Sequence, residues 1–518
     1  MYSEVFSTTI FGLEALVVRV EVDAGNGLPF FEMSGYLAAQ VREAKERVRV
    51  SIKNSGYELR PQRIIVNISP ADVKKAGTGF DLPIAVGLLA ANGYINSNKL
   101  KDIVIIGELS LDGTVNAVSG VLSSVIAAKE KGYSICIVPF DNVYEAKLTR
   151  GISIYGVKNL KELIHFLNHG MIPDVMNNVV EGQNDSIFAA FDDTHLDFKD
   201  IRGQMVAKRA TLVAAAGMHN LLYIGAPGSG KTMFAKRISG ILPDLTYDEA
   251  LQITKIYSIA GCLSRNSFIR KRPFRSPHHS ITKTAFLGGG VLPKPGEITL
   301  ASSGVLFLDE LTEFPTCILE SLRQPLEDKA IRLVRLSREY VYPSDFMLVA
   351  AMNPCRCGYY PNRKRCNCSE RDIARFLGRI SQPIYDRFDM NVHFENIDFK
   401  DLSEENDKKE VSKENIYTTD HMKAIVERVH KIQQKRFQER SIYFNSQMDV
   451  ADIQKYCILG VREKKLLEKA YNKLNLTVRG YNKILKVART IADIEGNSDI
   501  QASHISEAIS YRNRLGVM

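Results

Sequence analysis

The strongest constraint on the fold of this chain is a short segment, residues 221–232, which runs Leu-Leu-Tyr-Ile-Gly-Ala-Pro-Gly-Ser-Gly-Lys-Thr. An apolar run of strand length passes into a glycine-rich loop, and a segment with helical character, 233–240, follows directly. The spacing of the glycines, the lysine and the threonine is that of a phosphate-binding loop. Because such a loop joins a strand to a helix in a parallel sheet, we expect an α/β nucleotide-binding domain.

Each residue type in this loop has a defined task toward a nucleotide. Glycines let backbone N–H groups turn toward the phosphates, and the following helix points its N-terminus at the same anion. Lys231 is expected to reach the terminal phosphates, and Thr232 to help hold Mg²⁺. A glycine-rich turn without a ligand is the alternative, which the lysine and the hydroxyl argue against. The expected ATP-binding residues are Gly225, Ala226, Pro227, Gly228, Ser229, Gly230, Lys231 and Thr232.

Two further apolar strands end in polar residues that suit ATP hydrolysis. The strand 304–308 is followed by Asp309 and Glu310. We expect the aspartate to hold Mg²⁺ and the glutamate to orient and deprotonate the attacking water. The strand 347–352 is followed by Asn353, which is expected to lie beside the γ-phosphate and hold the water. The three strands together predict an ATPase site.

Two arginines are candidates for contacts with the γ-phosphate. Arg387 is predicted to be an arginine finger at a subunit edge, where it would reach the nucleotide of a neighbouring subunit, and Arg379 is the alternative for this role. Arg479 opens a predicted helix and is expected on the same phosphate as a second sensor. An arginine supplied in trans neutralises transition-state charge that a lone subunit cannot. For each arginine, a surface ion pair is the other interpretation.

The composition changes along the 518 residues, which are too many for a single core. Residues 1–170 alternate strands and helices and predict an α+β domain, and 171–197 is an Asn-, Asp- and Gly-rich stretch that predicts a linker. Residues 198–400 follow the strand–helix alternation of a parallel sheet, and 401–518 are rich in Lys- and Glu-containing helical segments. We therefore expect an ATPase core followed by a helical lid.

The bulk properties predict a cytoplasmic protein. We expect no signal peptide, because Glu4 stands early and no cationic segment precedes an apolar core, and no apolar run is long enough to span a bilayer. The net charge of +9 and the pI near 8.9 are compatible with a polyanionic partner without requiring one. We expect no membrane partner.

The order of these motifs is similar to that of AAA+ ATPases, and four segments narrow the resemblance. They are Pro273–His279, Gly288–Gly290, Pro295–Glu297 and Leu322–Asp328, and they resemble the magnesium-chelatase-like ComM/YifB branch. The resemblance extends over nearly the whole chain. It implies a homohexameric ring with additional hairpins facing the pore: a helix-2 insert within 270–300 and a pre-sensor hairpin at 330–345.

The chemistry of both hairpins suits a nucleic acid. Arginines and lysines follow phosphates while aromatic rings stack on bases, and Phe268, Phe274 and Phe286 lie between the basic residues of the first region. A solvated charged face is the alternative. His278 and His279 are left open between a contact with the strand and simple packing. The expected DNA-binding residues are Arg275, Lys283, Arg332, Arg335 and Arg338.

Four cysteines occur in two Cys-x-Cys pairs directly after the third ATPase strand. Cys355 and Cys357 are separated from Cys366 and Cys368 by a Gly-Tyr-Tyr-Pro turn and three basic residues. Four thiolates in one short loop satisfy tetrahedral Zn²⁺ without an open position, which predicts a structural site. Unligated thiols are the alternative, and the spacing does not suit an iron–sulfur cluster. The other cysteines, Cys136, Cys262, Cys317 and Cys457, are expected to be buried small apolar residues.

The N-terminal region resembles the proteolytic domain of Lon, on the segments Ala76–Pro83 and Ile106–Gly113. Lon hydrolyses peptides with a Ser–Lys dyad. The segment expected to contain the serine has none, and the segment Ser119–Ser124, expected to contain the lysine, has no lysine. We therefore expect an inactive protease fold. A pair of Thr78 with Lys74 or Lys75 is the remaining, unfavoured alternative.

These observations favour an ATP-dependent DNA translocase, acting as a hexameric helicase or branch-migration motor on single-stranded or branched DNA. The resemblance implies a role in natural transformation or recombination, with recombination proteins as possible partners. The alternative is a chelatase-type AAA+ protein that remodels a protein partner. The missing dyad argues against a Lon-like protease.

Overall fold

The computed structural model describes residues 1–170, 196–263, 267–290, 293–335, 338–395 and 417–512. The chain divides into two compact units. The first contains Met1–Ala189, Tyr247–Ile269 and Leu333–Tyr342, and the second contains Ala190–Thr246, Arg270–Arg332 and Pro343–Met518. The predicted linker lies outside the described residues except for 196 and 197, and so does the first part of the predicted lid, 401–416.

A seven-stranded mixed sheet forms the centre of the first unit, in the order β3-β4-β2-β1-β5-β8-β9. Its two longest strands, β1 and β2, pair antiparallel with Tyr2 opposite Asp23 and Phe11 opposite Glu14. The strands are β1 (Tyr2–Phe11), β2 (Glu14–Gly25), β3 (Phe30–Ser34), β4 (Arg63–Ser69), β5 (Ile103–Ile105), β8 (Ile135–Pro139) and β9 (Ser153–Val157). A short hairpin joins β6 (Glu108–Leu109) to β7 (Val115–Asn116).

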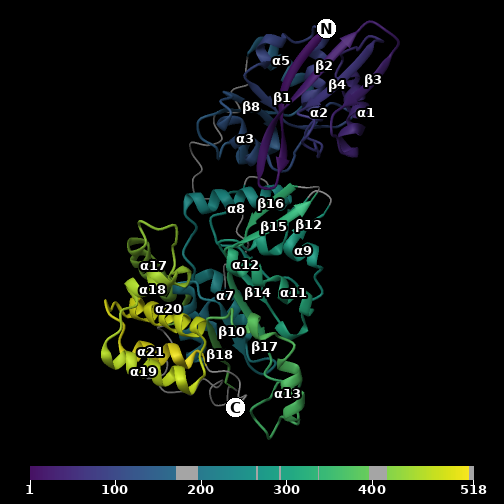
Figure 1. Cartoon of the computed structure of the whole chain (residues 1–518). Coiled ribbons are helices and arrows are strands. Elements are labelled where there is room, and N and C mark those ends of the chain that lie inside the picture. Colours follow the sequence, from purple (N-terminus) through teal and green to yellow (C-terminus); the bar gives the residue numbers. More distant parts are fainter. Residues whose placement is uncertain (171–195, 264–266, 291–292, 336–337, 396–416, 513–518) are drawn as a thin grey trace. The chain divides into compact units, whose positions relative to one another are not determined.

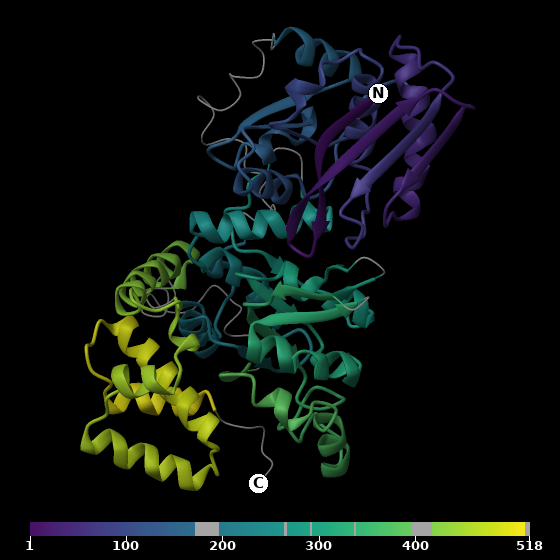
Figure 2. The ribbon, with the colours of Figure 1, turned by 45° about the horizontal axis from the view of Figure 1, so that its top comes forward.

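Helices cover this sheet (Figures 1 and 2). Every residue of α2 is buried, because this helix packs directly on β1 and β2 with apolar residues all round. Helix α1 instead has one buried stripe, Val41, Ala44, Val48 and Ile52. The helices are α1 (Ala39–Asn54), α2 (Asp81–Ala91), α3 (Val121–Glu130), α4 (Val143–Ala146) and α5 (Leu160–His169).

Two segments from the predicted ATPase region pack within the first unit. In α8 (Tyr247–Ala260), the Tyr247 hydroxyl donates to the Leu148 carbonyl at 3.0 Å, and Ser258 Oγ accepts from Gly120 N at 2.9 Å and donates to Glu145. Burial raises the pKa of Glu145 even though these hydrogen bonds oppose the shift. The second segment is the tip of the hairpin formed by β15 (Ala330–Arg335) and β16 (Arg338–Pro343). The first unit thus also includes two segments that lie within residues 198–400 of the sequence.

A five-stranded parallel sheet forms the centre of the second unit, in the order β11-β14-β17-β10-β18. The strands are β10 (Leu221–Ile224), β11 (Phe274–Arg275), β14 (Val305–Leu308), β17 (Met347–Met352) and β18 (Met390–His393). The strands β10, β14 and β17 are entirely buried, as expected for a parallel sheet covered on both faces. The predicted α/β fold is therefore confirmed. All carboxyl ends of these strands lie along one edge.

Short elements and the helices α6 and α7 surround the sheet. They are α6 (Met205–Gly217), α7 (Lys231–Ile241), α9 (Lys283–Leu287), β12 (Gly288–Gly289), β13 (Lys294–Pro295), α10 (Glu297–Leu300), α11 (Thr316–Ser321), α12 (Arg323–Asp328), α13 (Glu370–Leu377) and α14 (Gln382–Tyr385). The last five helices gather beside the sheet in yellow and light green (Figure 2). They are α17 (Thr419–Arg436), α18 (Val450–Tyr456), α19 (Val461–Lys473), α20 (Val478–Glu495) and α21 (Ala502–Ser510).

The C-terminal helices share one core with the ATPase sheet. Helix α20 buries Ile484, Val487, Ala488 and Ile491 in the same apolar cluster as strand β10 and helix α6. A buried ion pair between Arg436 and Asp493, with N–O distances of 2.6 and 2.7 Å, ties α17 to α20. None of the described helices is both long and apolar enough to cross a membrane.

Candidate functional site

The glycine-rich loop joins β10 to α7 at the carboxyl edge of the parallel sheet. Gly228 and Gly230 have φ angles of 74° and 94°, in the left-handed region that residues with a Cβ rarely adopt. The start of the loop is fixed to the neighbouring strand, because Gly225 N donates to the Met352 carbonyl at 3.2 Å. Lys231 is the first residue of α7, so the loop ends at a helix N-terminus that favours an anion. The predicted strand–loop–helix arrangement is present.

The Lys231 ammonium lies at the centre of this loop. It donates to the carbonyls of Gly225 and Ala226 at 2.8 Å each and to Asn353 Oδ1 at 3.2 Å. Burial lowers the pKa of Lys231 to about 8, although the carboxylates of Asp309 and Glu310 oppose the shift. A charged phosphate group bound beside Lys231 would therefore raise this pKa again and restore the ammonium form.

The hydroxyl and carboxylate expected to hold Mg²⁺ are adjacent. Thr232 Oγ1 donates to Asp309 Oδ2 at 2.8 Å, which joins the start of α7 to the end of β14. Glu310 follows with a φ of 50°, and its N–H donates to Asp309 Oδ1 at 2.9 Å. Its side chain is exposed, whereas Asp309 is half-buried. Hard oxygen ligands beside a phosphate-binding loop fit the requirements of Mg²⁺.

The two predicted γ-phosphate arginines meet at one carboxylate. This carboxylate is that of Glu327 in α12. Arg387 donates to its Oε2 at 2.6 Å, and Arg479 donates to its Oε1 at 2.7 Å. Hydrogen bonding to Arg387, with the charges of both arginines, lowers the pKa of Glu327. No hydrogen bond or ion pair joins either arginine to the described residues of the P-loop. Arg379, the alternative finger, pairs with Glu313 at 3.1 Å instead.

The predicted DNA-binding residues fall into two groups. Lys283, at the start of α9, and Arg332 and Arg335, on β15, have exposed side chains. Arg275 forms a two-pronged ion pair with Glu297 at 2.6 and 2.7 Å, so its guanidinium is already engaged. Arg338 donates to the Asp72 carbonyl and lies 5.5 Å from the centre of the Phe11 ring.

Two of the three phenylalanines expected to stack on bases are in the core. Phe286 is fully buried and Phe268 is 8% exposed, while Phe274 stacks on Phe307 with ring centres 5.9 Å apart. The expectation was wrong for Phe268 and Phe286, because a local sequence does not distinguish an apolar anchor from an exposed ring. A hollow of about 500 Å³ is lined by Phe274, Arg275, Ser276, Pro277, His278, Ser280, Ile281 and Glu297. The rings of His278 and His279 are tilted by 35° to each other, with their centres 4.0 Å apart.

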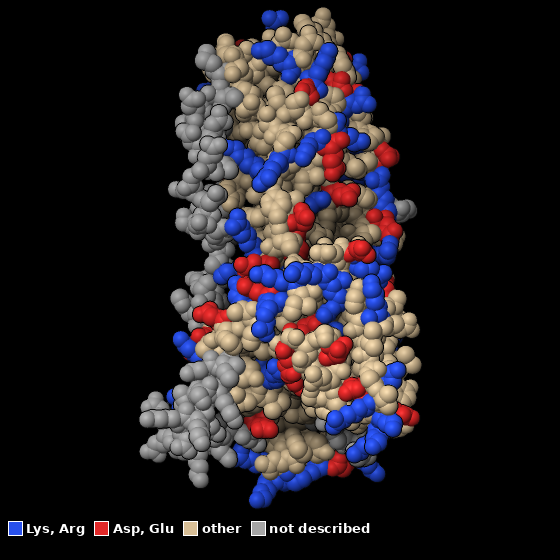
Figure 3. Space-filling view, turned by 90° about the vertical axis from the view of Figure 1, so that its left-hand side faces the viewer, with Lys and Arg blue, Asp and Glu red and all other residues tan. Residues whose placement is uncertain are grey.

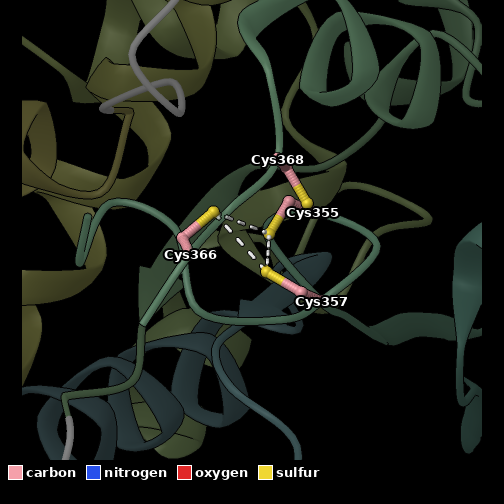
Figure 4. A group of neighbouring side chains, drawn as sticks. All are labelled: Cys355, Cys357, Cys366 and Cys368. Atoms are coloured by element: carbon pink, nitrogen blue, oxygen red, sulfur yellow. Dashed lines mark hydrogen bonds between the residues drawn. The ribbon is translucent and has the colours of Figure 1, made fainter. Parts of the chain in front are cut away.

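The four cysteines of the two Cys-x-Cys pairs converge in one cluster (Figure 4). Their sulfurs all lie within 4.8 Å of one another, with separations of 3.3, 3.5 and 3.7 Å among Cys355, Cys357 and Cys366. Four thiolates at about 2.3 Å from Zn²⁺ in a tetrahedron are about 3.8 Å apart, so the donor set fits this ion. This loop of 355–368 is called the knuckle below. It supports the predicted zinc site.

The thiols of the knuckle differ in their affinity for protons. Burial raises the pKa of Cys366 to about 12. Burial acts the same way on Cys357, but hydrogen bonds from the Tyr359 N–H and the neighbouring thiols lower its pKa to about 6. A cation that binds all four sulfurs has to displace the remaining protons.

The knuckle also contacts the phosphate-binding loop. Gly358 has a φ of 84°, and a Cβ at this position would lie 2.3 Å from Cδ of Pro227. The glycine is therefore required both by its backbone conformation and by the close approach of the P-loop. Ile373 of α13 packs against Cys355 and Cys366 from the other side. The cysteine loop thus supports one side of the nucleotide site.

The remaining four cysteines differ in burial. Cys136 and Cys457 are buried as expected, but Cys262 and Cys317 are exposed. Cys262 follows the end of α8, and Cys317 is the second residue of α11. At both positions the neighbouring apolar residues in the sequence point in a different direction from the cysteine. The prediction that these two are buried was wrong.

The Lon-like segment contains no Thr–Lys pair. Thr78 Oγ1 donates to Glu108, while the fully buried Lys75 donates to the Pro70 carbonyl. Lys74 lies 5.9 Å from the centre of the Tyr36 ring. Each candidate group thus has a different partner, and the inactive protease fold stays a prediction from the sequence.

Sequence analysis missed Glu327 and Gly358 as site residues. Glu327 lies in the motif Leu322–Asp328, which was used only for its family resemblance, and its role becomes visible when Arg387 and Arg479 meet on it. Gly358 follows the second cysteine, and a glycine between metal-ligand pairs is a signal for a tight turn. Its contact with Pro227 is a tertiary feature.

Family models cover most of the chain. The model "Magnesium chelatase, subunit ChlI" matches residues 197–402, "Subunit ChlI of Mg-chelatase" matches 20–142, and "Magnesium chelatase, subunit ChlI C-terminal" matches 417–512. These matches agree with the resemblance found in the sequence motifs.

Curated relatives extend over the full length. Competence protein ComM of Haemophilus influenzae is 39% identical over 508 residues, 98% of this chain and 97% of that protein. Protein YifB of Escherichia coli is 39% identical over 512 residues, again 98% of this chain and 97% of that protein. The archaeal Lon protease of Methanocaldococcus jannaschii is 27% identical over 157 residues, 29% of this chain and 24% of that protein. The similarity to Lon is thus weak and partial.

The lowered pKa of Lys231 predicts that ATP binding takes up protons. At pH 8 the nucleotide-free lysine is about half protonated, and adjacent phosphate charge restores the ammonium, so we expect uptake of about 0.5 proton per ATP. Uptake should fall toward pH 6.5, where the lysine is already charged. Titration calorimetry in buffers of different ionisation enthalpy measures it. Lys231→Arg, which keeps its charge, should bind without this uptake; equal uptake would assign the proton to another group.

The sulfur geometry predicts one Zn²⁺ per chain, lost when a ligand is removed. Cys366→Ser should lower the zinc content to near zero and lower the melting temperature, because a site with three thiolates binds the ion weakly. Atomic emission spectroscopy on the purified protein measures the metal. The matched control is Cys262→Ser, an exposed cysteine outside the cluster. Full zinc content in the Cys366 variant would contradict the site.

Proposed function

The chain belongs to the ComM/YifB family of magnesium-chelatase ChlI-like AAA+ proteins, and on this basis we propose that it is an ATP-driven DNA translocase. The proposed activity is that of a hexameric helicase or branch-migration motor in natural transformation or recombination. The observation that supports it most is the convergence of Lys231, Thr232, Asp309 and Asn353 at one sheet edge. Full-length similarity to a competence protein supports DNA as the substrate.

The family implies ATP and Mg²⁺, and the residues at the sheet edge fit both. Lys231 would hold the terminal phosphates, and Thr232 and Asp309 would hold Mg²⁺, which neutralises phosphate charge when bound. The exposed Glu310 carboxylate would accept a proton from the attacking water. Asn353, held by Lys231, would orient that water.

The arrangement of the arginines supports hydrolysis at a subunit interface. Arg387 and Arg479 share Glu327 and contact no described P-loop residue of their own chain. In the proposed ring, the γ-phosphate of the ATP bound to a neighbouring subunit replaces the Glu327 carboxylate as the partner of both arginines. Six such interfaces would then be active in turn and move the pore hairpins.

The exposed arginines of the β15–β16 hairpin are the proposed contacts with DNA in the pore. Arg332 and Arg335 have exposed side chains on β15. Figure 3 shows Lys and Arg side chains over much of one face, interrupted by acidic side chains rather than gathered in one patch. The positive net charge therefore supports a polyanionic partner only in general terms, and the hairpin residues make the proposal specific.

Remodelling of a protein partner is the second candidate. It is favoured by the magnesium chelatase family models, since these models describe a chelatase subunit. A DNA-independent ATPase rate would favour this candidate.

The central experiment is ATP hydrolysis with and without single-stranded DNA. We expect DNA to stimulate the wild-type rate, and Glu310→Gln to lower it by about 10²–10⁴-fold because the general base is lost. Glu468→Gln, an exposed glutamate on α19, is the matched control and should be unaffected. A rate that is the same with and without DNA would contradict the translocase.

Complementation tests whether Arg387 acts in trans. Glu310→Gln and Arg387→Ala proteins should each be inactive alone. In an equimolar mixture, random rings would contain about a quarter of interfaces with both groups intact, so about a quarter of the wild-type rate should return. Hydrolysis of radiolabelled ATP measures the recovery. No recovery, with mixed rings verified by differential tags, would place Arg387 in its own subunit's site.

A further inference from the structure

We propose that the knuckle and helix α13 form a second DNA-binding surface, which takes the phosphodiester backbone of a single strand. This inference rests on the proposed function and adds a contact outside the hairpin residues. The surface, called the knuckle surface, consists of Arg356, Lys364, Arg365, Arg371 and Arg375. In Figure 1, α13 and the loop before it project at one end of the second unit.

The charge of this segment is strongly one-sided. From Cys355 to Ile380 the chain has seven arginines and lysines and only two acidic residues. A divalent cation bound by four thiolates leaves a formal charge of about −2, which is smaller than the excess of five basic groups. The segment therefore stays positive with the metal bound, as a binding site for a polyanion requires.

Local ion pairs engage only part of this charge. Arg363 pairs with Glu370, and Arg379 pairs with Glu313 at 3.1 Å. All five side chains of the knuckle surface are exposed, and Lys364, Arg365 and Arg371 form no ion pair with any described residue. Nor does any described basic side chain donate a hydrogen bond to a cysteine sulfur. The arginines are thus not used to neutralise the thiolates.

An exposed aromatic ring accompanies the charges. Tyr359, between the two cysteine pairs, is 37% exposed, whereas the Tyr360 ring has the Arg363 guanidinium 5.0 Å from its centre. Basic groups beside an accessible aromatic ring are the combination that proteins use for single strands, because every base has a face that stacks. This combination favours a single strand over a duplex.

The position of the knuckle gives bound DNA a short route to the ATPase site. The loop begins two residues after Asn353, and Gly358 lies directly against Pro227 of the phosphate-binding loop. A strand on the knuckle surface therefore contacts the segment that packs on the nucleotide loop. The geometry connects DNA binding to ATP hydrolysis through this one contact.

The test compares two triple variants that remove equal charge. The knuckle variant is Lys364→Gln, Arg365→Gln and Arg371→Gln, and the matched control is Lys464→Gln, Lys465→Gln and Lys469→Gln, which are exposed lysines on α19. Fluorescence anisotropy with a labelled oligothymidine measures affinity from low to moderate salt. The slope of log K against log salt should fall by about 2 in the knuckle variant and stay unchanged in the control.

Zinc content and the DNA-free ATPase rate separate binding from folding. Both should equal the wild-type values in the knuckle variant, while stimulation by DNA should fall. An unchanged salt slope in the knuckle variant, with wild-type protein still binding DNA, would overturn the knuckle surface and leave the translocase in place. If neither the wild type nor the control binds the oligonucleotide, the proposed function itself fails.

Discussion

The functional site depends on the parallel hydrogen bonding of five strands. Because β10 lies between β17 and β18, and β17 lies beside β14, the residues that follow these strands meet at one edge. Met352 lies opposite Ile224 and Ala350 opposite Leu308, so Asn353 and Asp309 are placed next to the P-loop by register alone. The contacts of Lys231 with Asn353 and of Thr232 with Asp309 are consequences of this alignment. A slip of one residue in β17 would reverse its side chains and remove the site.

The convergence of Lys231, Thr232, Asp309 and Asn353 at one sheet edge could be predicted from sequence, because each of the three segments that contain them directly follows an apolar strand. The partners of the arginines could not, since Glu297, Glu327 and Asp72 are far from them in sequence. The strands β1 and β3 were also not predicted. Of these, β1 contains Ser3, Ser7, Thr8 and Thr9, all buried polar residues, which obscure its apolar pattern. The buried phenylalanines show the same limit, because an aromatic residue among basic ones gives no sign of its orientation.

The cysteine loop was predicted from spacing, but its importance for the nucleotide site follows from packing. Its four sulfurs converge, and the turn at Gly358 lies between the two cysteine pairs. The same turn contacts Pro227, so the cysteine loop and the glycine-rich loop share one close contact. A loop of this length without a metal has little apolar core, apart from Ile373 and its neighbours. A metal ion bound at the sulfur site would therefore also stabilise the outer side of the P-loop through this contact.

In the proposed ring, Glu327 would serve each subunit as an internal substitute for a phosphate. It holds Arg387 and Arg479 together, and Arg479 belongs to the C-terminal helix α20 while Arg387 precedes β18. Because this carboxylate is half exposed, ion pairs of its kind contribute about 0–1 kcal/mol, so an incoming polyphosphate would displace it at little cost. Under the proposed function, the two arginines would then be transferred as a pair. If the two arginines exchanged the Glu327 carboxylate for a phosphate, a subunit contact would form and the helical lid would be released in a single event.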